Sequence, residues 1–198
     1  MIFPDGCRNK NFREETLTAY LFLSLILACK LQTIFFAMIK ETKTELFADY
    51  FQFYIQDENA DGDLSDSWTQ EAVDRLLALA PGTIGVGTVR NMHVPVTVKI
   101  FDSEPEMIAD NEHIAQINEC SLETDTGRLV LAGCTDYFPD ALRIEVTPGT
   151  HRARIYYGNL DKISEDGLDG EDFYEIHLWR TNKNEALLIV KDRNRATP

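Results

Sequence analysis

The chain is poor in cysteine, and this limits the kinds of site that it can build. Its 198 residues hold four cysteines, and no two of them stand in a C-x-x-C pair. Such spacing indicates neither a zinc site nor a redox pair. Cys120 and Cys134 flank a predicted turn in a register that points their side chains to opposite faces of a sheet, which is poor geometry for a disulfide. We therefore expect free thiols, which favour a cytoplasmic location.

Basic residues are scarce as well. The sequence holds 19 Lys and Arg against 33 Asp and Glu, which gives a formal net charge of −14. A surface with this charge repels phosphate groups, so direct binding of nucleic acid is disfavoured. The same surface suits a basic protein partner, or serves solubility alone.

The short motifs of common enzyme classes are missing. The sequence has no GxSxG and no HExxH, and its four histidines are scattered. Residues 82–87 hold three glycines, but they follow a predicted helix instead of opening one, as a phosphate-binding loop would. We therefore expect a protein that is not an enzyme and needs no cofactor.

No apolar run is clearly long enough to cross a bilayer alone. The uninterrupted run Ala19–Cys29 is shorter than the roughly 20 residues of a membrane-spanning helix. Three interpretations of the wider segment 17–37 stay open: translated sequence upstream of a start at Met38, a signal peptide or lipid anchor, and a membrane anchor. We place a boundary here, between an N-terminal extension (1–37) and an acidic domain (38–198). Export or membrane contact is expected only if the extension is a real signal or anchor.

The rest of the chain has the pattern of a β protein with one helix. Residues 45–55 are rich in aromatic and β-branched side chains and predict one long strand. A helix is expected over 68–79, with Ser67 and Gln70 as its capping box and Pro81 after its end.

Further strands are expected in close succession over 83–90, 94–101, 114–122, 129–133, 142–146, 151–157, 173–179 and 186–190. We expect the third and fourth of these to form a hairpin, and the fifth and sixth another. Pro95 favours a strand at a sheet edge. The turn spacing predicts a mainly β fold: a single β-sandwich-like domain of about nine strands, with one α-helix after the first strand.

An acidic loop before the helix resembles the first half of an EF-hand calcium loop. Asp57, Asn59, Asp61 and Asp63 supply the oxygen atoms that hard Ca²⁺ prefers. Trp68, however, stands where the bidentate carboxylate is expected, and the preceding element is a strand instead of a helix. A calcium-binding β domain that uses these four residues is therefore kept as an alternative function.

A second acidic loop covers residues 165–172. If both loops lie at one end of the domain, they form one negative patch for a basic partner. Trp68 is either a core residue or an anchor for that partner. The predicted partner-binding residues are therefore Asp57, Asp61, Asp63, Asp66, Asp166, Asp169 and Trp68.

Three short motifs resemble the competence protein J family and its uncharacterised bacterial relatives. They are Phe51-Gln-Phe53, Trp68-Thr69-x-Glu71-Ala72 and Gly85-x-x-x-x-Arg90-Asn91. The resemblance is clearest over residues 45–100. It implies an all-β acidic domain in the cytoplasm that inhibits a nuclease by binding it, because the best-described member inhibits a DNA-entry nuclease.

Overall fold

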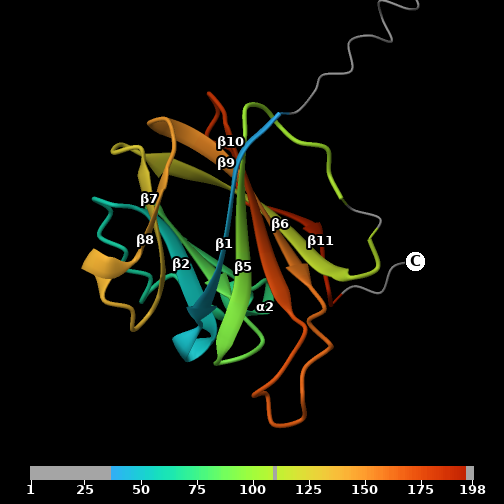
Figure 1. Ribbon diagram of the computed structural model, residues 1–198. Helices are drawn as coiled ribbons and strands as arrows, with labels where there is room; N and C mark the ends of the chain where they lie inside the picture. Colours follow the sequence, from blue (N-terminus) through green and yellow to red (C-terminus); the bar gives the residue numbers. More distant parts are fainter. Residues whose placement is uncertain (1–36, 109–110, 195–198) are drawn as a thin grey trace, which may run out of the picture. The chain divides into compact units, whose positions relative to one another are not determined.

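The computed structural model describes residues 37–108 and 111–194, and within these ranges the chain forms eleven strands in two sheets (Figure 1). The six-stranded sheet has the order β1-β5-β10-β9-β6-β11, and only its β5-β10 pair is parallel. Its strands are β1 (Met38–Phe47), β5 (His93–Phe101), β6 (Ile114–Thr124), β9 (Gly149–Gly158), β10 (Phe173–Arg180) and β11 (Leu188–Lys191).

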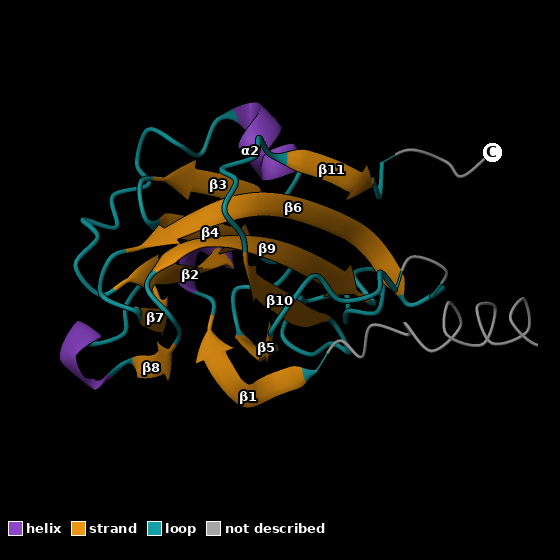
Figure 2. Ribbon diagram, turned by 90° about the horizontal axis from the view of Figure 1, so that it is seen from above, coloured by secondary structure: helices purple, strands orange, loops and turns teal. Residues whose placement is uncertain are grey.

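The five-stranded sheet is antiparallel throughout and has the order β3-β4-β2-β7-β8. Its strands are β2 (Gln52–Asp57), β3 (Leu77–Ala80), β4 (Thr83–Gly87), β7 (Arg128–Gly133) and β8 (Leu142–Glu145). The helical elements are the helix α2 (Gln70–Asp74) and the 3₁₀ turns η1 (Asp49–Phe51) and η2 (Phe138–Asp140). The helix lies beside β3, at the edge of the sheet (Figure 2).

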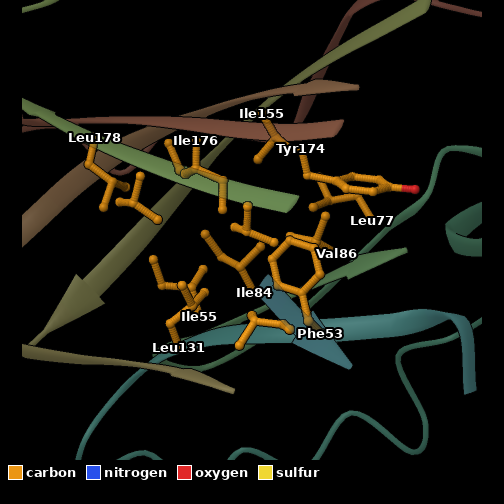
Figure 3. Close-up of a cluster of buried hydrophobic side chains, with 14 of the residues drawn as sticks. Phe53, Ile55, Leu77, Ile84, Val86, Leu131, Ile155, Tyr174, Ile176 and Leu178 are labelled. Carbon is orange, nitrogen blue, oxygen red and sulfur yellow. The ribbon is translucent and has the colours of Figure 1, made fainter. Parts of the chain in front are cut away.

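One apolar core separates the two sheets. Alternate residues of the central strands of each sheet point into it and are buried, as the period of two along a strand requires. The side chains that meet there include Phe53, Ile55, Ile84, Val86 and Leu131 from the five-stranded sheet and Ile155, Tyr174, Ile176 and Leu178 from the six-stranded sheet (Figure 3). The predicted mainly β, sandwich-like fold is confirmed, with eleven strands instead of about nine.

The long strand predicted over residues 45–55 is wrong, because it is two strands in different sheets. The turn η1 separates β1 from β2 and reverses the chain with positive φ angles at Tyr50 (57°) and Phe51 (58°). Gly133 packs against this crossing so closely that a Cβ atom there would lie 2.2 Å from the carbonyl oxygen of Phe47. A larger residue at position 133 would therefore collide with the backbone at this crossing.

The predicted helix over residues 68–79 is largely wrong. Helix α2 has five residues, and its N-cap is Thr69, whose hydroxyl accepts a hydrogen bond from the backbone N–H of Ala72. The hydroxyl of Ser67, the predicted cap, donates instead to the carbonyl of Leu79 at 2.9 Å. The chain leaves the helix through Leu76, which has a φ of 56°, and then forms β3.

Neither predicted hairpin forms. Strands β6 and β7 belong to different sheets, and so do β8 and β9, so each connection crosses between the layers of the sandwich. Cys120 and Cys134 are free thiols, one buried and one partly exposed. Burial raises the pKa of the Cys120 thiol to about 12, which makes it an unreactive core residue.

The strand that holds Pro95 is not a sheet edge, because β5 pairs with β1 on one side and β10 on the other. The proline precedes the first pairing with β10, at Val96. Across the described residues, no helix has the length and apolar character that a membrane crossing requires. The predicted extension 1–37 lies outside the described residues except for its last residue, so its boundary stays a prediction.

Candidate protein-binding surface

The first acidic loop forms one wall of a hollow at the C-terminal end of β2. The hollow has a volume of about 380 Å³. The end of β6 and the turn after it also line the hollow and add two carboxylates, those of Glu123 and Asp125. No Lys or Arg is among the described residues that line this acidic hollow, which are Asp57, Asn59, Ala60, Asp61, Gly62, Asp63, Ala80, Pro81, Gly82, Glu123 and Asp125.

Asp57 is a structural residue of this hollow, because its side chain is buried and only 5% of the residue is exposed. Its carboxylate accepts hydrogen bonds from the hydroxyls of Thr124 and Thr126 and from the backbone N–H groups of Thr126 and Asn59. Burial acts to raise the pKa of Asp57, but these hydrogen bonds outweigh it and lower the pKa. The carboxylate therefore fastens the end of β2 to the end of β6 and the turn after it, and a role for Asp57 in partner binding stays a prediction.

The remaining acidic residues of the loop are presented to solvent. Asp61, Asp63 and Asp66 are exposed. The carboxylate of Asp63 accepts hydrogen bonds from the hydroxyl and backbone N–H of Ser65, which lower its pKa and keep it charged. Among the described residues, no group of three or more His, Cys, Asp or Glu side chains has an arrangement that could hold a metal ion. Calcium binding at the four predicted ligands therefore stays a prediction.

The second acidic loop is not brought together with the first. It joins β9 to β10, and its base is fixed by a buried ion pair in which Arg90 Nε lies 2.6 Å from Asp172 Oδ1. Arg90 also donates to the carbonyl of Leu168 at 3.1 Å. Because β4 runs from the acidic hollow toward Arg90, the two loops lie at opposite ends of the sandwich. Asp166 and Asp169 are exposed there.

An apolar groove lies on the outer side of the five-stranded sheet, near η1. It has a volume of about 560 Å³. We call it the aromatic groove. It is lined by Tyr50, Phe51, Gln52, Trp68, Val73, Leu76, Gly87, Thr88, Val89 and Arg193. Two of its aromatic side chains point largely to solvent, since Tyr50 is 73% exposed and Phe51 is 54% exposed. Exposed apolar groups gathered in this way mark interaction sites more often than isolated ones.

Trp68 connects the groove to the sheet below it. The indole packs over Gly85, where a Cβ atom would lie 2.9 Å from its ring, and beside Leu64 and Tyr54. Its Nε1–H is buried and has no hydrogen-bond partner among the described residues. Trp68 therefore packs partly against the sheet and also lines the groove.

The three family-like motifs converge on this groove from distant parts of the chain. Phe51 and Trp68 line it, and Gly85 lies beneath the indole. Asn91 accepts a hydrogen bond from the backbone N–H of Phe51 at 3.4 Å, and Arg90 anchors the neighbouring loop. The sequence does not indicate that these motifs meet, because the aromatic residues of the turn at 49–51 favour a strand as much as those around them.

The outer face of the six-stranded sheet holds a separate set of charged side chains. Arg154 donates to the carboxylates of Glu119 and Glu104 and to the carbonyl of Pro105, while Arg152 donates to Glu119. These groups satisfy one another, so ordinary cross-strand pairing between β6 and β9 accounts for them.

Fold and surface together define, within the described residues, a two-sheet β protein of the sandwich class, with carboxylate-rich loops at both ends and an apolar groove on its surface. Among solved structures, the chain is similar to ComJ from Bacillus subtilis, described as an inhibitor of the DNA-degrading activity of NucA. The similarity has a TM-score of 0.56 at 18% sequence identity and covers 73% of this chain and all of that one. At this identity the likeness shows the fold, so the resemblance to the competence protein J family is confirmed for the fold.

A second solved structure, the product of crocagin biosynthetic gene J, aligns with a TM-score of 0.48 at 19% identity, over 71% of this chain and 96% of that one. No protein-family model and no curated protein matches the sequence.

Proposed function

We propose that the chain is a non-enzymatic, protein-binding module that inhibits a nuclease by covering the basic surface on which the nuclease holds its substrate. The fold it shares with ComJ supports this proposal, since that protein is described as a nuclease inhibitor. The partner is then a basic protein, and the cytoplasm is the compartment that suits the free thiols.

The observation that carries the proposal is the acidic hollow. Four of its carboxylates, those of Asp61, Asp63, Glu123 and Asp125, come from two distant segments that the fold holds together, and no described basic residue lines the hollow to neutralise them. A surface built to bind DNA phosphates is positively charged, so the two surfaces are complementary. Such complementarity accelerates association and makes it sensitive to salt.

The two acidic loops provide a matched test. In the first variant Asp61 and Asp63 become Asn, and in the control variant Asp166 and Asp169 become Asn. Both changes remove the same charge, and Asp63 and Asp166 each accept hydrogen bonds from a nearby serine and a backbone N–H. Their effects on net charge and local structure are therefore comparable.

The measurement is the association rate with a purified basic DNA-entry nuclease, together with inhibition of its DNA cleavage, at low and moderate salt. We expect the first variant to associate about tenfold more slowly at low salt, with little change in the control. Equal losses in both variants would show that only net charge matters. Absence of inhibition by the unmodified chain would end the nuclease proposal.

A further inference from the structure

We propose that the aromatic groove is the docking site for a large apolar side chain carried by a basic segment of the protein partner. This inference deepens the proposed function, since it rests on the partner being a protein. In this proposal the acidic hollow attracts the partner, and the aromatic groove holds it once it is bound.

The shape of the groove is fixed before any partner arrives. The carbonyl of Phe51 accepts a hydrogen bond from the N–H of Thr88 at 2.8 Å. The N–H of Phe51 donates a hydrogen bond to the carbonyl of Ala48 at 3.1 Å. The N–H of Tyr50 donates to the carboxylate of Asp49 at 3.0 Å. The turn η1 is therefore tied to the sheet by its backbone and needs neither aromatic ring for its geometry.

The two aromatic residues occupy backbone conformations that disfavour them. Tyr50 and Phe51 both have φ values in the left-handed region, which glycine and asparagine adopt far more readily. A turn chosen for stability alone would not place two large, mostly exposed rings there. Rigid aromatic side chains lose little conformational entropy on binding and dominate the energetics of protein interfaces.

The charge around the groove identifies the kind of segment that fits. Trp68 and Val73 line one side of the groove, and the exposed residues Asp66, Glu71 and Asp74 stand within two positions of them in the chain, beside the lining itself. Arg193 is the one basic residue among the described lining residues. An apolar side chain flanked by Lys or Arg would therefore place its ring or alkyl group in the groove and its charges against these carboxylates.

The groove contains its own reporter. The sequence has two tryptophans, of which Trp68 lines the groove and Trp179 is 5% exposed on β10 of the other sheet. Each indole N–H gives one signal in a nitrogen-edited NMR spectrum of the full chain, and a Trp179→Phe variant assigns them. Trp68 then reports occupation of the groove, and Trp179 is the internal control.

The probes are three short synthetic peptides: one with several lysines around a central Phe, one with the same lysines around Ala, and one with glutamates around Phe. We expect the first peptide to shift the Trp68 signal in a saturable manner and to leave the Trp179 signal in place. The second and third peptides should bind at least tenfold more weakly, because each lacks one of the two features that the groove recognises.

Phe51→Gly and Tyr50→Gly test the anchors without unfolding the turn, because glycine tolerates a positive φ. Each should weaken binding of the lysine–Phe peptide about tenfold while the Trp179 signal stays native. If no peptide moves the Trp68 signal, or if the lysine–Ala peptide moves it equally, the inference is wrong. It is also wrong if the Trp68 signal moves with protein concentration alone, because the occupant is then a second copy of the chain.

These outcomes separate the inference from the proposed function. If the chain inhibits a nuclease but the lysine–Phe peptide does not shift its Trp68 signal, the proposed function stands and the docking site in the groove is wrong. If the chain binds the peptide at Trp68 but inhibits no nuclease, the proposed function is wrong and the groove is a docking site for a different basic protein.

Discussion

Replacement of Asp57 by alanine should destabilise the fold strongly, although the residue stands at the end of β2, next to a largely exposed loop. Its carboxylate accepts four hydrogen bonds in a buried setting, from Thr124, Thr126 and Asn59. A hydrogen bond to a charged group contributes about 1.5–3 kcal/mol, and the contributions of one cluster do not add fully. We therefore expect a loss of about 3 kcal/mol in the free energy of unfolding at neutral pH.

Asp57→Asn should cost less, about 1–2 kcal/mol. Its amide oxygen can still accept from the threonines, but its NH₂ group then faces the N–H of Asn59. Urea unfolding, analysed for both midpoint and slope, measures these differences. Asp61→Ala removes an exposed carboxylate from the same loop and should leave the midpoint unchanged.

The effect of Asp57 should also depend on pH. Since the hydrogen bonds hold its pKa below the ordinary value, the folded state releases this proton more readily than the unfolded state. The stabilisation is then complete above the unfolded pKa of about 3.9 and is lost as the pH falls through the folded pKa. The difference between wild type and Asp57→Ala should therefore stay constant from neutral pH to about 5 and shrink below about 4. A loss no larger than that of Asp61→Ala, or one that does not change with pH, would refute this reasoning.

Two further predictions concern the other acidic groups. Asp172→Ala should lower the free energy of unfolding by about 3–5 kcal/mol, because it leaves Arg90 buried without its carboxylate, whereas Asp169→Ala should have little effect in the same urea titration. Millimolar Ca²⁺ should leave the melting temperature unchanged, because the carboxylate of Asp57 is already engaged by Thr124 and Thr126. A saturable rise in melting temperature that Asp61→Asn abolishes would restore the calcium-binding alternative.

Strand positions were predictable where the alternation of apolar residues agreed with the core. In β5, a strand predicted over 94–101, the alternate residues Val94, Val96, Val98 and Ile100 are all buried. The break after Phe47 was not predictable, because the aromatic residues that follow favour a strand as much as those before them. Only the close packing of Gly133 and the positive φ of the turn reveal it, and both are tertiary features.

The helix shows how tertiary pairing overrides local propensity. Residues 72–80 include good helix formers at helical spacing. Leu77 and Leu79 nevertheless belong to β3, which pairs with β4 and forms an edge of the five-stranded sheet. A short apolar run with both periods cannot be assigned by periodicity alone. In the strand conformation, Leu77 is buried in the core between the sheets and Leu79 packs against that core.

The missed carboxylates of the acidic hollow follow from the wrong hairpins. A local reading pairs strands that are close in sequence, whereas this fold sends β7 and β8 to the sheet opposite β6 and β9. The end of β6 and the turn after it, with Glu123 and Asp125, thereby reach the loop that follows Asp57, far away in sequence. Nothing in the spacing of these residues indicates that they share a site.

The acidic hollow and the aromatic groove are joined by one stretch of chain, and this suggests a division of labour between them. Asp61 and Asp63 line the hollow, and a few residues later Trp68 and Val73 line the groove. Charges act over distance and mainly raise the rate of association, whereas desolvated aromatic contacts mainly slow dissociation. Neutralising Asp61 and Asp63 should therefore change the association rate and its dependence on salt, while Phe51→Gly should change the dissociation rate. A single partner that contacts both regions would show the two effects independently in the same binding measurement.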